Sequence, residues 1–504
     1  MNQNILRKLM LIAVLLTGSH AFAHDFEVDG IYYNITSDLT VEVTYQGSSY
    51  DIYDNEYSGN VIIPNSVTYD GSTYTITSIG DTAFCVCSSL TSVSIPNSVT
   101  SINGYSFYGC SALTSVSIPN SVTSIGEAAF YSCSSLTSAT IPSSVTSIDK
   151  YAFFKCENLT RVNITDIEKW CEIKFYSAYS NPLYYAKELY LNDELFSNLE
   201  IPNTITSINH FTFYNCTSLT NVTIPNSVTN IATSAFCGCT GLTSISIPNS
   251  VIGIGNSAFS KCSGLEDLTI GNSVTSIGES AFSNCKKLTS VTIPNSVNSI
   301  GNYTFMSCTG LTNITIPKSV TNIGDATFMG CTSLINITIP KSVTSIGDAA
   351  FGNCTGLTSI TIPKSVTSIG NLAFAYCSSL YETICESSTP TIAYSNTFLN
   401  IPTTAKLYVP VGSKEAYASS EGWSSFTNII EDDAKTGIES ALADDVNVAV
   451  ENGNIVVNGA ENANIEVYSM NGECVYSGTA TTIHVTAKGL YIVKVNDKSF
   501  KVIL

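Results

Sequence analysis

Cysteine is the residue type whose spacing most suggests chemistry in this chain. The sequence holds 17 cysteines. Most recur every 23 residues in two runs: Cys87, Cys110, Cys133 and Cys156, then Cys216, Cys239, Cys262, Cys285, Cys308, Cys331, Cys354 and Cys377. Stacked neighbours at this period could form disulfides in an exported protein. Alternatively, each thiol fills a small slot in the core, and the parallel side chains of an in-register stack favour this second interpretation.

Two cysteine doublets, Cys85-Val-Cys87 and Cys237-Gly-Cys239, resemble metal-ligand spacing. In each doublet the second cysteine belongs to the 23-residue row and no histidine stands beside it, so we expect no metal site. Three histidines follow residue 23: His24, His210 and His484. No Ser-His-acid set can be drawn from them, and P-loop, zincin and calcium-loop motifs are absent from the sequence. We therefore predict that the protein is not an enzyme and uses no cofactor.

Aromatic residues gather in an irregular stretch, residues 166–200, where about 14 extra residues interrupt the period because Cys156 and Cys216 lie 60 rather than 46 apart. The candidate binding residues here are Trp170, Phe175, Tyr176, Tyr179, Tyr184 and Tyr185. Large aromatic side chains dominate binding hot spots, so an exposed cluster would favour ligand binding. The alternative is that these rings pack under their own loop as a local core.

A second group of candidates is an uncharged row of hydroxyl and amide side chains. Its members alternate with apolar residues in successive repeats: Ser290, Thr292, Asn313, Thr315, Asn336, Thr338, Ser359 and Thr361. Alternation of this kind places the polar side chains on the outer face of a strand. Such a row would offer a broad surface to a protein or glycan, or it would merely reflect the preference of strands for Ser and Thr.

The elements that must position these residues are short strands in a 23-residue repeat. In Leu113-Thr-Ser-Val116-Ser-Ile118 the apolar side chains alternate as in a strand with one buried face. Pro119 ends that strand, and a second short strand is predicted over 122–125. One repeat cannot bury its own apolar side chains, but stacked repeats can. The sequence therefore predicts a mainly β leucine-rich-repeat solenoid of short parallel strands with 3₁₀ or irregular segments, plus a small C-terminal β-sandwich.

The chain divides into six predicted segments. Arg7, Lys8, an apolar run and Ala21-Phe-Ala23 are typical of a signal peptide. The expected organisation is a signal peptide over 1–23, a β-rich cap over 24–80, the solenoid over 81–381 with its insert at 166–200, a C-terminal cap over 382–431, a linker over 432–445, and a β-sandwich over 446–504. We see no other apolar run of the ~20 residues that a membrane helix needs.

The net charge of the chain argues against some classes of partner. Only 12% of residues are charged and the formal net charge is −19. An acidic surface with few lysines argues against nucleic acid and anionic membranes as partners. Together with the predicted signal peptide, this composition indicates a secreted or outer-surface protein without a transmembrane segment.

The repeat "LTSVTIPNSVNSIGNYTFMSC" (288–308) resembles the leucine-rich repeat of BspA-like bacterial surface proteins. That resemblance covers about 61–430 and implies adhesion to proteins or glycans on host matrix or other cells. A structural coat protein without a specific ligand, or a glycan-capture protein, are the alternatives. The tail, with Gly489-Leu-Tyr491 and Phe500-Lys-Val502, is similar to type IX secretion sorting domains, although it ends in Ile503-Leu504 rather than a basic residue.

Overall fold

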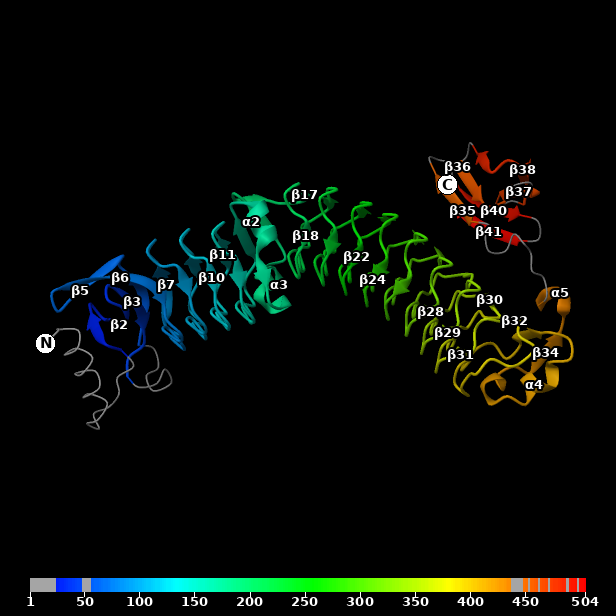
Figure 1. Ribbon diagram of the computed structural model, residues 1–504, viewed down its shortest axis with the longest axis horizontal. Helices are drawn as coiled ribbons and strands as arrows, with labels where there is room; N and C mark the ends of the chain where they lie inside the picture. Colours follow the sequence, from blue (N-terminus) through cyan, green and yellow to red (C-terminus); the bar gives the residue numbers. More distant parts are fainter. Residues whose placement is uncertain are drawn as a thin grey trace.

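The structure is a computed structural model that describes residues 24–47, 56–436, 447–451, 454–460, 463–469, 472–485, 489–495 and 498–504. The predicted signal peptide and most of the predicted linker lie outside these residues. Stacked coils form an elongated arc that runs from the N-terminal region to a group of short helices, and the C-terminal strands lie beside the arc (Figure 1).

Most coils contribute one longer strand, and neighbouring longer strands pair in parallel and in register within several sheets. In β9, for example, Val116 pairs with Val93 of β7 and with Ala139 of β11, each 23 residues away. The longer strands are β4 (Gly59–Ile62), β7 (Leu90–Ser94), β9 (Ser115–Ser117), β11 (Ser138–Ile141), β13 (Arg161–Ile164), β15 (Leu189–Leu191), β17 (Asn198–Glu200), β19 (Asn221–Thr223), β21 (Ser244–Ile247), β23 (Asp267–Ile270), β25 (Ser290–Thr292), β27 (Asn313–Thr315), β30 (Ser359–Ile362) and β32 (Glu382–Cys385). We call the outer side of these strands the long-strand face.

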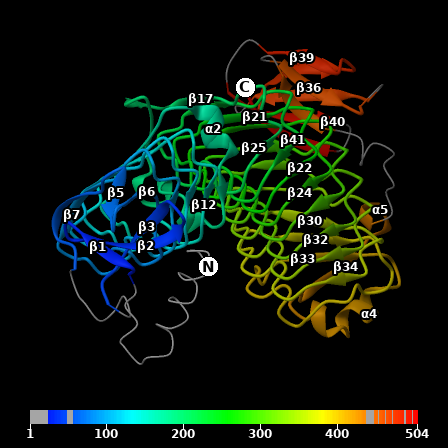
Figure 2. The same cartoon turned by 60° about the vertical axis from the view of Figure 1, so that its left-hand side comes forward.

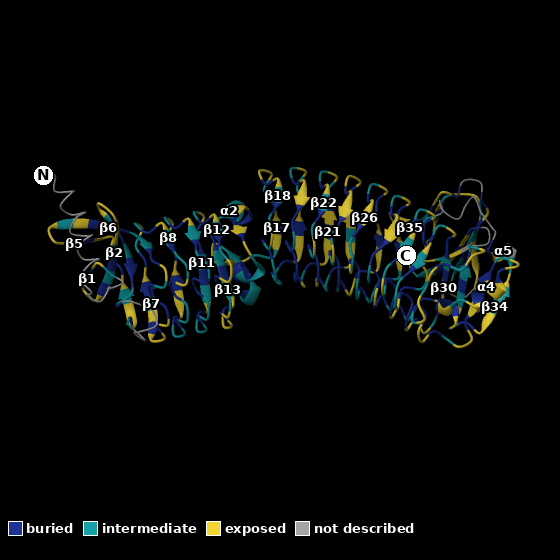
Figure 3. Cartoon of the chain, turned by 60° about the horizontal axis from the view of Figure 1, so that its bottom comes forward, coloured by how far each residue is buried: buried dark blue, intermediate teal, exposed yellow. Residues whose placement is uncertain are grey.

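A second, two-residue strand follows in most coils and pairs in the same way, so that Ile102, Ile125 and Ile148 form one buried row. These strands are β8 (Ser101–Ile102), β10 (Ser124–Ile125), β12 (Ser147–Ile148), β14 (Lys174–Phe175), β18 (Ser207–Ile208), β20 (Asn230–Ile231), β22 (Gly253–Ile254), β24 (Ser276–Ile277), β26 (Ser299–Ile300), β28 (Asn322–Ile323), β29 (Ser345–Ile346) and β31 (Ser368–Ile369). Their outer side is the short-strand face. Buried and exposed positions repeat from coil to coil on the strands (Figure 3). The predicted solenoid of stacked parallel strands is confirmed.

Phenylalanines fill the centre of the solenoid. Phe236, Phe259, Phe282 and Phe305 are fully buried, and their ring centroids lie 5.3 to 5.7 Å apart in near-parallel stacks. The chain reverses tightly beside each ring, and the turns use left-handed backbone such as φ 51° at Ala128 and 59° at Ser132. Because every ring is covered by the rings of its neighbours, a single coil would leave this apolar surface in water.

The N-terminal end is closed by strands that continue the short-strand sheet. They are β1 (Phe26–Val28), β2 (Ile31–Ser37), β3 (Thr40–Thr44), β5 (Ser66–Tyr69) and β6 (Ser72–Ile79), of which β6 pairs with β8. The Tyr57 ring lies 4.5 Å from the first core ring, Phe84. This arrangement covers the apolar end of the stack, as an open solenoid end requires.

The C-terminal end is closed by β33 (Lys406–Val409), α4 (Lys414–Ala418), the 3₁₀ helix η2 (Glu421–Trp423), β34 (Asn428–Glu431) and α5 (Asp433–Thr436). The Phe398 ring continues the core stack 5.3 Å from Phe374, and Trp423 packs 5.0 Å from Phe398. The Trp423 indole donates to the Thr391 carbonyl oxygen at 2.9 Å, so the buried ring is also satisfied as a donor.

The tail forms two antiparallel sheets around its own core. The first sheet contains β35 (Asn447–Glu451), β36 (Asn454–Asn458) and β39 (Thr482–His484), and the second contains β37 (Ile465–Ser469), β38 (Cys474–Gly478), β40 (Leu490–Val495) and β41 (Lys498–Ile503). Figure 2 shows the tail beside β25, and residues of β35 and β41 line a cleft together with residues of β25 and β27 on the long-strand face.

Candidate functional site

The cysteine row is a ladder of free, buried thiols rather than a ladder of disulfides. Cys285 Sγ lies 3.3 Å from the Phe259 carbonyl oxygen of the preceding coil, and Cys308 Sγ lies 3.1 Å from that of Phe282. The same S–H···O contact recurs in coil after coil. Burial is the main cause that raises the pKa of Cys156 and Cys308 to about 12 and that of Cys285 well above its ordinary value. These thiols stay protonated and serve packing.

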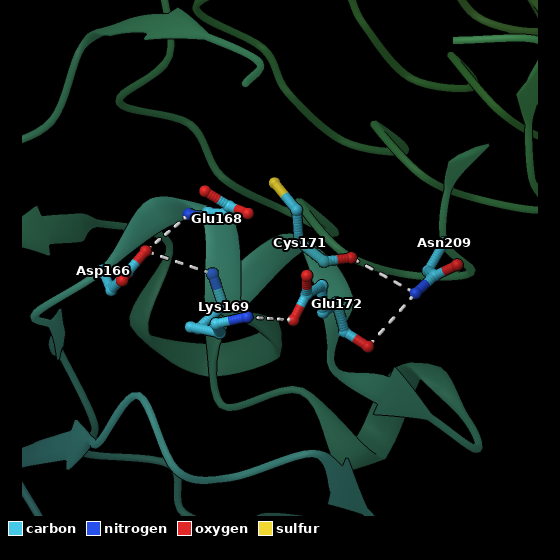
Figure 4. Close-up of polar contacts among 6 residues, drawn as sticks. All are labelled: Asp166, Glu168, Lys169, Cys171, Glu172 and Asn209. Carbon is cyan, nitrogen blue, oxygen red and sulfur yellow. Dashed lines mark hydrogen bonds and ion pairs between the residues drawn. The ribbon is translucent and has the colours of Figure 1, made fainter. Parts of the chain in front are cut away.

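The insert replaces one regular coil with a short helix, α2 (Ile167–Glu172), the strand β14, the 3₁₀ helix η1 (Ala178–Ser180) and the helix α3 (Leu183–Ala186). Asp166 caps α2 by accepting from the backbone N–H groups of Glu168 and Lys169 at 2.9 and 3.2 Å. Asn209 of the next coil donates to the carbonyl oxygens of Cys171 and Glu172 (Figure 4). An amide side chain thus joins the insert to the coil that follows, where β14 and β18 do not pair.

Two of the six aromatic candidates in the insert are core residues. Trp170 is 1% exposed and Phe175 is 5% exposed, and their ring centroids lie 5.2 Å apart. The Trp170 indole donates to the Thr212 carbonyl oxygen at 3.1 Å, and Phe175 pairs with Ile148 and so extends the buried row of isoleucines. Of the two interpretations of the insert, Trp170 and Phe175 follow the second, a local core, and neither side chain is open to a ligand.

Three other candidates, Tyr179, Tyr184 and Tyr185, are half-buried and packed against neighbouring rings. Tyr179 stacks on Tyr151 at 5.7 Å, and Tyr184 stacks on Tyr214 at 5.7 Å. The Tyr185 hydroxyl accepts from the Lys155 backbone N–H at 3.1 Å. Neighbouring side chains of the protein therefore cover part of these rings. Tyr176 differs, since 55% of its surface is exposed.

The predicted hydroxyl and amide row lies on the long-strand face. Ser290, Thr292, Asn313 and Thr315 are exposed and flank the buried Val291 and Ile314. Asn336 and Thr338 are also exposed, but no strand forms over 335–338. Ser359 and Thr361 are half-buried in β30.

Part of this row faces the tail. A cleft of about 320 Å³ is lined by Ser290, Thr292, Asn313, Thr315 and Asn336 on one side. The other side is lined by β35 and β41, including the exposed apolar side chains of Val450 and Ile503. The row therefore meets both open solvent and the chain's own tail.

Hydroxyl groups on the other side of the coils have a structural role. Thr123 Oγ1 donates to the Thr100 carbonyl oxygen at 3.2 Å, and Thr146 Oγ1 donates to that of Thr123 at 3.1 Å. These contacts tie successive coils together. Some of the Ser and Thr enrichment thus serves the fold. Within the described residues, the side chains of Ser290, Thr292, Asn313 and Thr315 make no such contact with one another.

The three histidines lie in different parts of the chain, and His484 Nδ1 contacts Asn454 Oδ1 within the tail at 2.7 Å. Among the described residues, no group of three or more His, Cys, Asp or Glu side chains is arranged to hold a metal ion. The same residues contain no helix long and apolar enough to cross a membrane. Exposed tyrosines that sequence reasoning did not single out are Tyr69, Tyr105, Tyr151, Tyr303, Tyr376, Tyr381 and Tyr394.

Comparison with known proteins places these features in a family context. Residues 51–181, 185–312 and 298–419 match the family model described as BspA type Leucine rich repeat region. The matched residues end before the tail, so the tail's resemblance to sorting domains stays a prediction. A search of the curated proteins finds no match.

Solved structures with the same repeat include a leucine-rich cell surface protein from Faecalibacterium prausnitzii A2-165. It is 31% identical, with 74% of this chain and 96% of that chain covered and a TM-score of 0.49. A leucine-rich repeat protein from Bacteroides ovatus ATCC 8483 is 27% identical, with 81% and 100% covered and a TM-score of 0.54. The pneumococcal vaccine antigen PcpA is 17% identical, with 82% and 100% covered and a TM-score of 0.46.

Proposed function

Because the chain belongs to the BspA-type leucine-rich repeat family, we propose that it is a secreted or cell-surface protein that binds macromolecules through the outer surface of its solenoid. The partner in this proposal is a protein or glycan on host matrix or on other cells. The chain acts by binding and not by catalysis, and its relatives are repeat proteins of a scaffold type. The similar protein from F. prausnitzii is described as a cell surface protein, which supports the location.

The observation that carries this proposal is the exposed polar row on the long-strand face. Exposed Ser290, Thr292, Asn313 and Thr315 repeat in register on rigid strands, so their positions are fixed before a partner arrives. Preorganised side chains lose little entropy on binding. A row without charge also has no strong repulsion toward an acidic or basic partner, and many weak contacts along one face would add by avidity.

In this proposal the tail has a different role from the solenoid. Its two antiparallel sheets have their own core, and the chain between residues 436 and 447 connects them to the solenoid. We assign it the role that its sequence resemblance implies, a sorting or anchoring domain. Because it lines the cleft beside the polar row, chains with and without the tail are needed in any binding experiment.

The experiment compares two matched double variants of the chain over 24–504 and of a chain ending at residue 436. Thr292→Lys with Thr315→Lys changes exposed, paired positions on the long-strand face, and Ser276→Lys with Ser299→Lys changes exposed, paired positions on the short-strand face. We expect saturable binding of the unmodified chain to matrix proteins and intact cells, at least tenfold weaker binding for the first variant, and an unchanged affinity for the second.

No saturable binding of either chain to matrix proteins, glycans or cells would overturn the proposal and favour a coat protein. Removal of residues 166–200 cannot serve as a binding test, because that deletion would remove the core residues Trp170 and Phe175.

A further inference from the structure

Two shallow troughs lie on the short-strand side, one in each half of the solenoid. The first, about 560 Å³, crosses the coils of β8, β10, β12 and β14 and is lined in part by Tyr105, Glu127 and Asp149. The second, about 440 Å³, crosses the coils of β28, β29 and β31 and is lined in part by Asn302, Asp325 and Asp348. Each trough contains the same repeat positions from successive coils, so its long direction follows the solenoid axis.

Each trough ends at a tyrosine that occupies the same repeat position. Ile148 pairs with Phe175, which places Tyr176 beside Asp149. At the other trough Ser368 pairs with Ile392, which places Tyr394 beside Gly370. Regular coils have Gly, Asn, Asp or Ala at this position, as in Gly126 and Gly347. The fold therefore does not require an aromatic residue at this position. Two separate coils nevertheless have a tyrosine there, each at the end of a trough.

The two tyrosine rings are available to a ligand. Tyr176 is 55% exposed and Tyr394 is 51% exposed. Within the described part of the chain, neither ring stacks on another aromatic ring and neither hydroxyl has a hydrogen-bond partner. In this they differ from Tyr179 and Tyr184, whose faces are covered by neighbouring rings. An uncovered ring face carries partial negative charge and attracts polarised C–H groups.

The rest of each trough offers mixed hydrogen-bonding groups. In the second trough, Ser345 and Ser368 bring hydroxyls, and Asn302 and Asn322 bring amides. The Asp325 carboxylate is held in place by the Asp348 backbone N–H at 2.9 Å. The first trough repeats this pattern, since Asp81 Oδ1 accepts from the Gly104 backbone N–H at 2.8 Å and Ser124 and Ser147 line the floor.

From these features we infer that each trough binds a neutral oligosaccharide lying along the solenoid axis, with one sugar ring stacked on Tyr176 or Tyr394. Sugar hydroxyls both donate and accept, which suits a row of hydroxyl, amide and carboxylate groups. The carboxylates would repel an anionic glycan. Backbone N–H groups already contact the carboxylates of Asp325 and Asp348, at 2.9 and 2.7 Å, which favours a neutral ligand over a cationic peptide. This inference goes beyond the proposed function, because it adds sites on the short-strand face to the binding proposed for the long-strand face.

The test uses the chain over 24–504 and isothermal titration calorimetry. The probes are neutral hexasaccharides built from glucose, xylose or mannose, a hexasaccharide of galacturonic acid, and a lysine-rich peptide. The variants are Tyr176→Ala, Tyr394→Ala and the double variant. Tyr381→Ala is the matched control, because Tyr381 is 52% exposed and lies outside both troughs. Thermal unfolding of each variant shows that it is folded.

We expect at least one neutral hexasaccharide to bind at two sites per chain. Each single variant should lose one site, with an affinity there at least tenfold weaker, and the double variant should lose both, while Tyr381→Ala binds like the unmodified chain. Binding of only the anionic sugar or the peptide, no binding of any neutral sugar, or binding unaffected by the double variant would overturn the inference. If matrix proteins or cells are still bound in those cases, the proposed function stands without it.

Discussion

At the scale of single residues, the thiol ladder explains how the solenoid is held together without cross-links. All cysteines are free in the structure, and Cys474 alone among the 17 is exposed. We predict that iodoacetamide modifies Cys474 in the native protein and reaches the remaining thiols only after unfolding, as measured by mass spectrometry of the intact chain. Disulfides would leave fewer reactive thiols in the unfolded protein without reductant, and such a deficit would contradict the ladder as described.

We predict that ionisation of the same thiols lowers stability at alkaline pH. The pKa of Cys156 and Cys308 rises from an ordinary value of 9.0 to about 12 on folding. A pKa raised by folding gives stability that is complete below the unfolded pKa and is lost as the pH rises toward the folded pKa. We therefore expect the free energy of unfolding to be steady near pH 7 to 8 and to fall steeply between about pH 9 and 12.

Urea unfolding at several pH values measures this loss. Each buried thiol contributes up to about 1.4 kcal/mol per pH unit in that window. The variant Cys156→Ala removes one such group, so its stability should fall less steeply above pH 9 than that of the unmodified chain. Equal slopes for the two proteins would show that the ladder thiols do not cause the alkaline loss.

At the scale of elements, the insert takes the place of a regular coil and contributes side chains to the core, instead of forming a loop outside it. Trp170 is buried, packs against Phe175 and donates to Thr212 of the next coil. We predict that Trp170→Ala lowers the free energy of unfolding by about 3 to 5 kcal/mol. Tyr176→Ala, six residues later and exposed, should change it by less than about 0.5 kcal/mol. Urea denaturation of the two variants checks both values, and a small effect of Trp170→Ala would mean that the insert is not part of the core.

The regular coils could be predicted from sequence, whereas the insert could not. Alternation in stretches such as Leu113 to Ile118 gives the strand and its buried face directly, and the 23-residue period gives the register. Within 166–200 no period remains, so nothing in the sequence separates a buried Trp170 from an exposed Tyr176. That distinction depends on contacts with Thr212 and Ile148, which lie in other coils.

The candidate sites likewise include features that the sequence predicts and features that it does not. The row from Ser290 to Thr315 was predicted on an outer strand face, and those side chains are exposed there. The positions of the tail beside that row and of Tyr394 beside Gly370 had no counterpart in the sequence pattern, because both depend on how distant segments meet. Tyr394 lies within the predicted C-terminal cap, and only the pairing of Ser368 with Ile392 places it at the end of a trough.

At the scale of the whole molecule, the length of the solenoid's outer surface is set by the number of coils. Each coil buries the apolar side chains of its neighbours, and equivalent positions are interchangeable. Residues 233–301 comprise three periods of 23, and their removal joins Ala232 to Asn302 in register. The shortened chain should therefore still stack its phenylalanines and cysteines without a gap.

Small-angle X-ray scattering of the chain over 24–504, with and without residues 233–301, tests this most directly. We predict that the shortened protein stays folded and that its maximum dimension falls by about 14 Å, three spacings of ~4.8 Å. An unfolded shortened protein, or a compact particle whose maximum dimension does not change, would contradict the account of an extended surface built from equivalent coils.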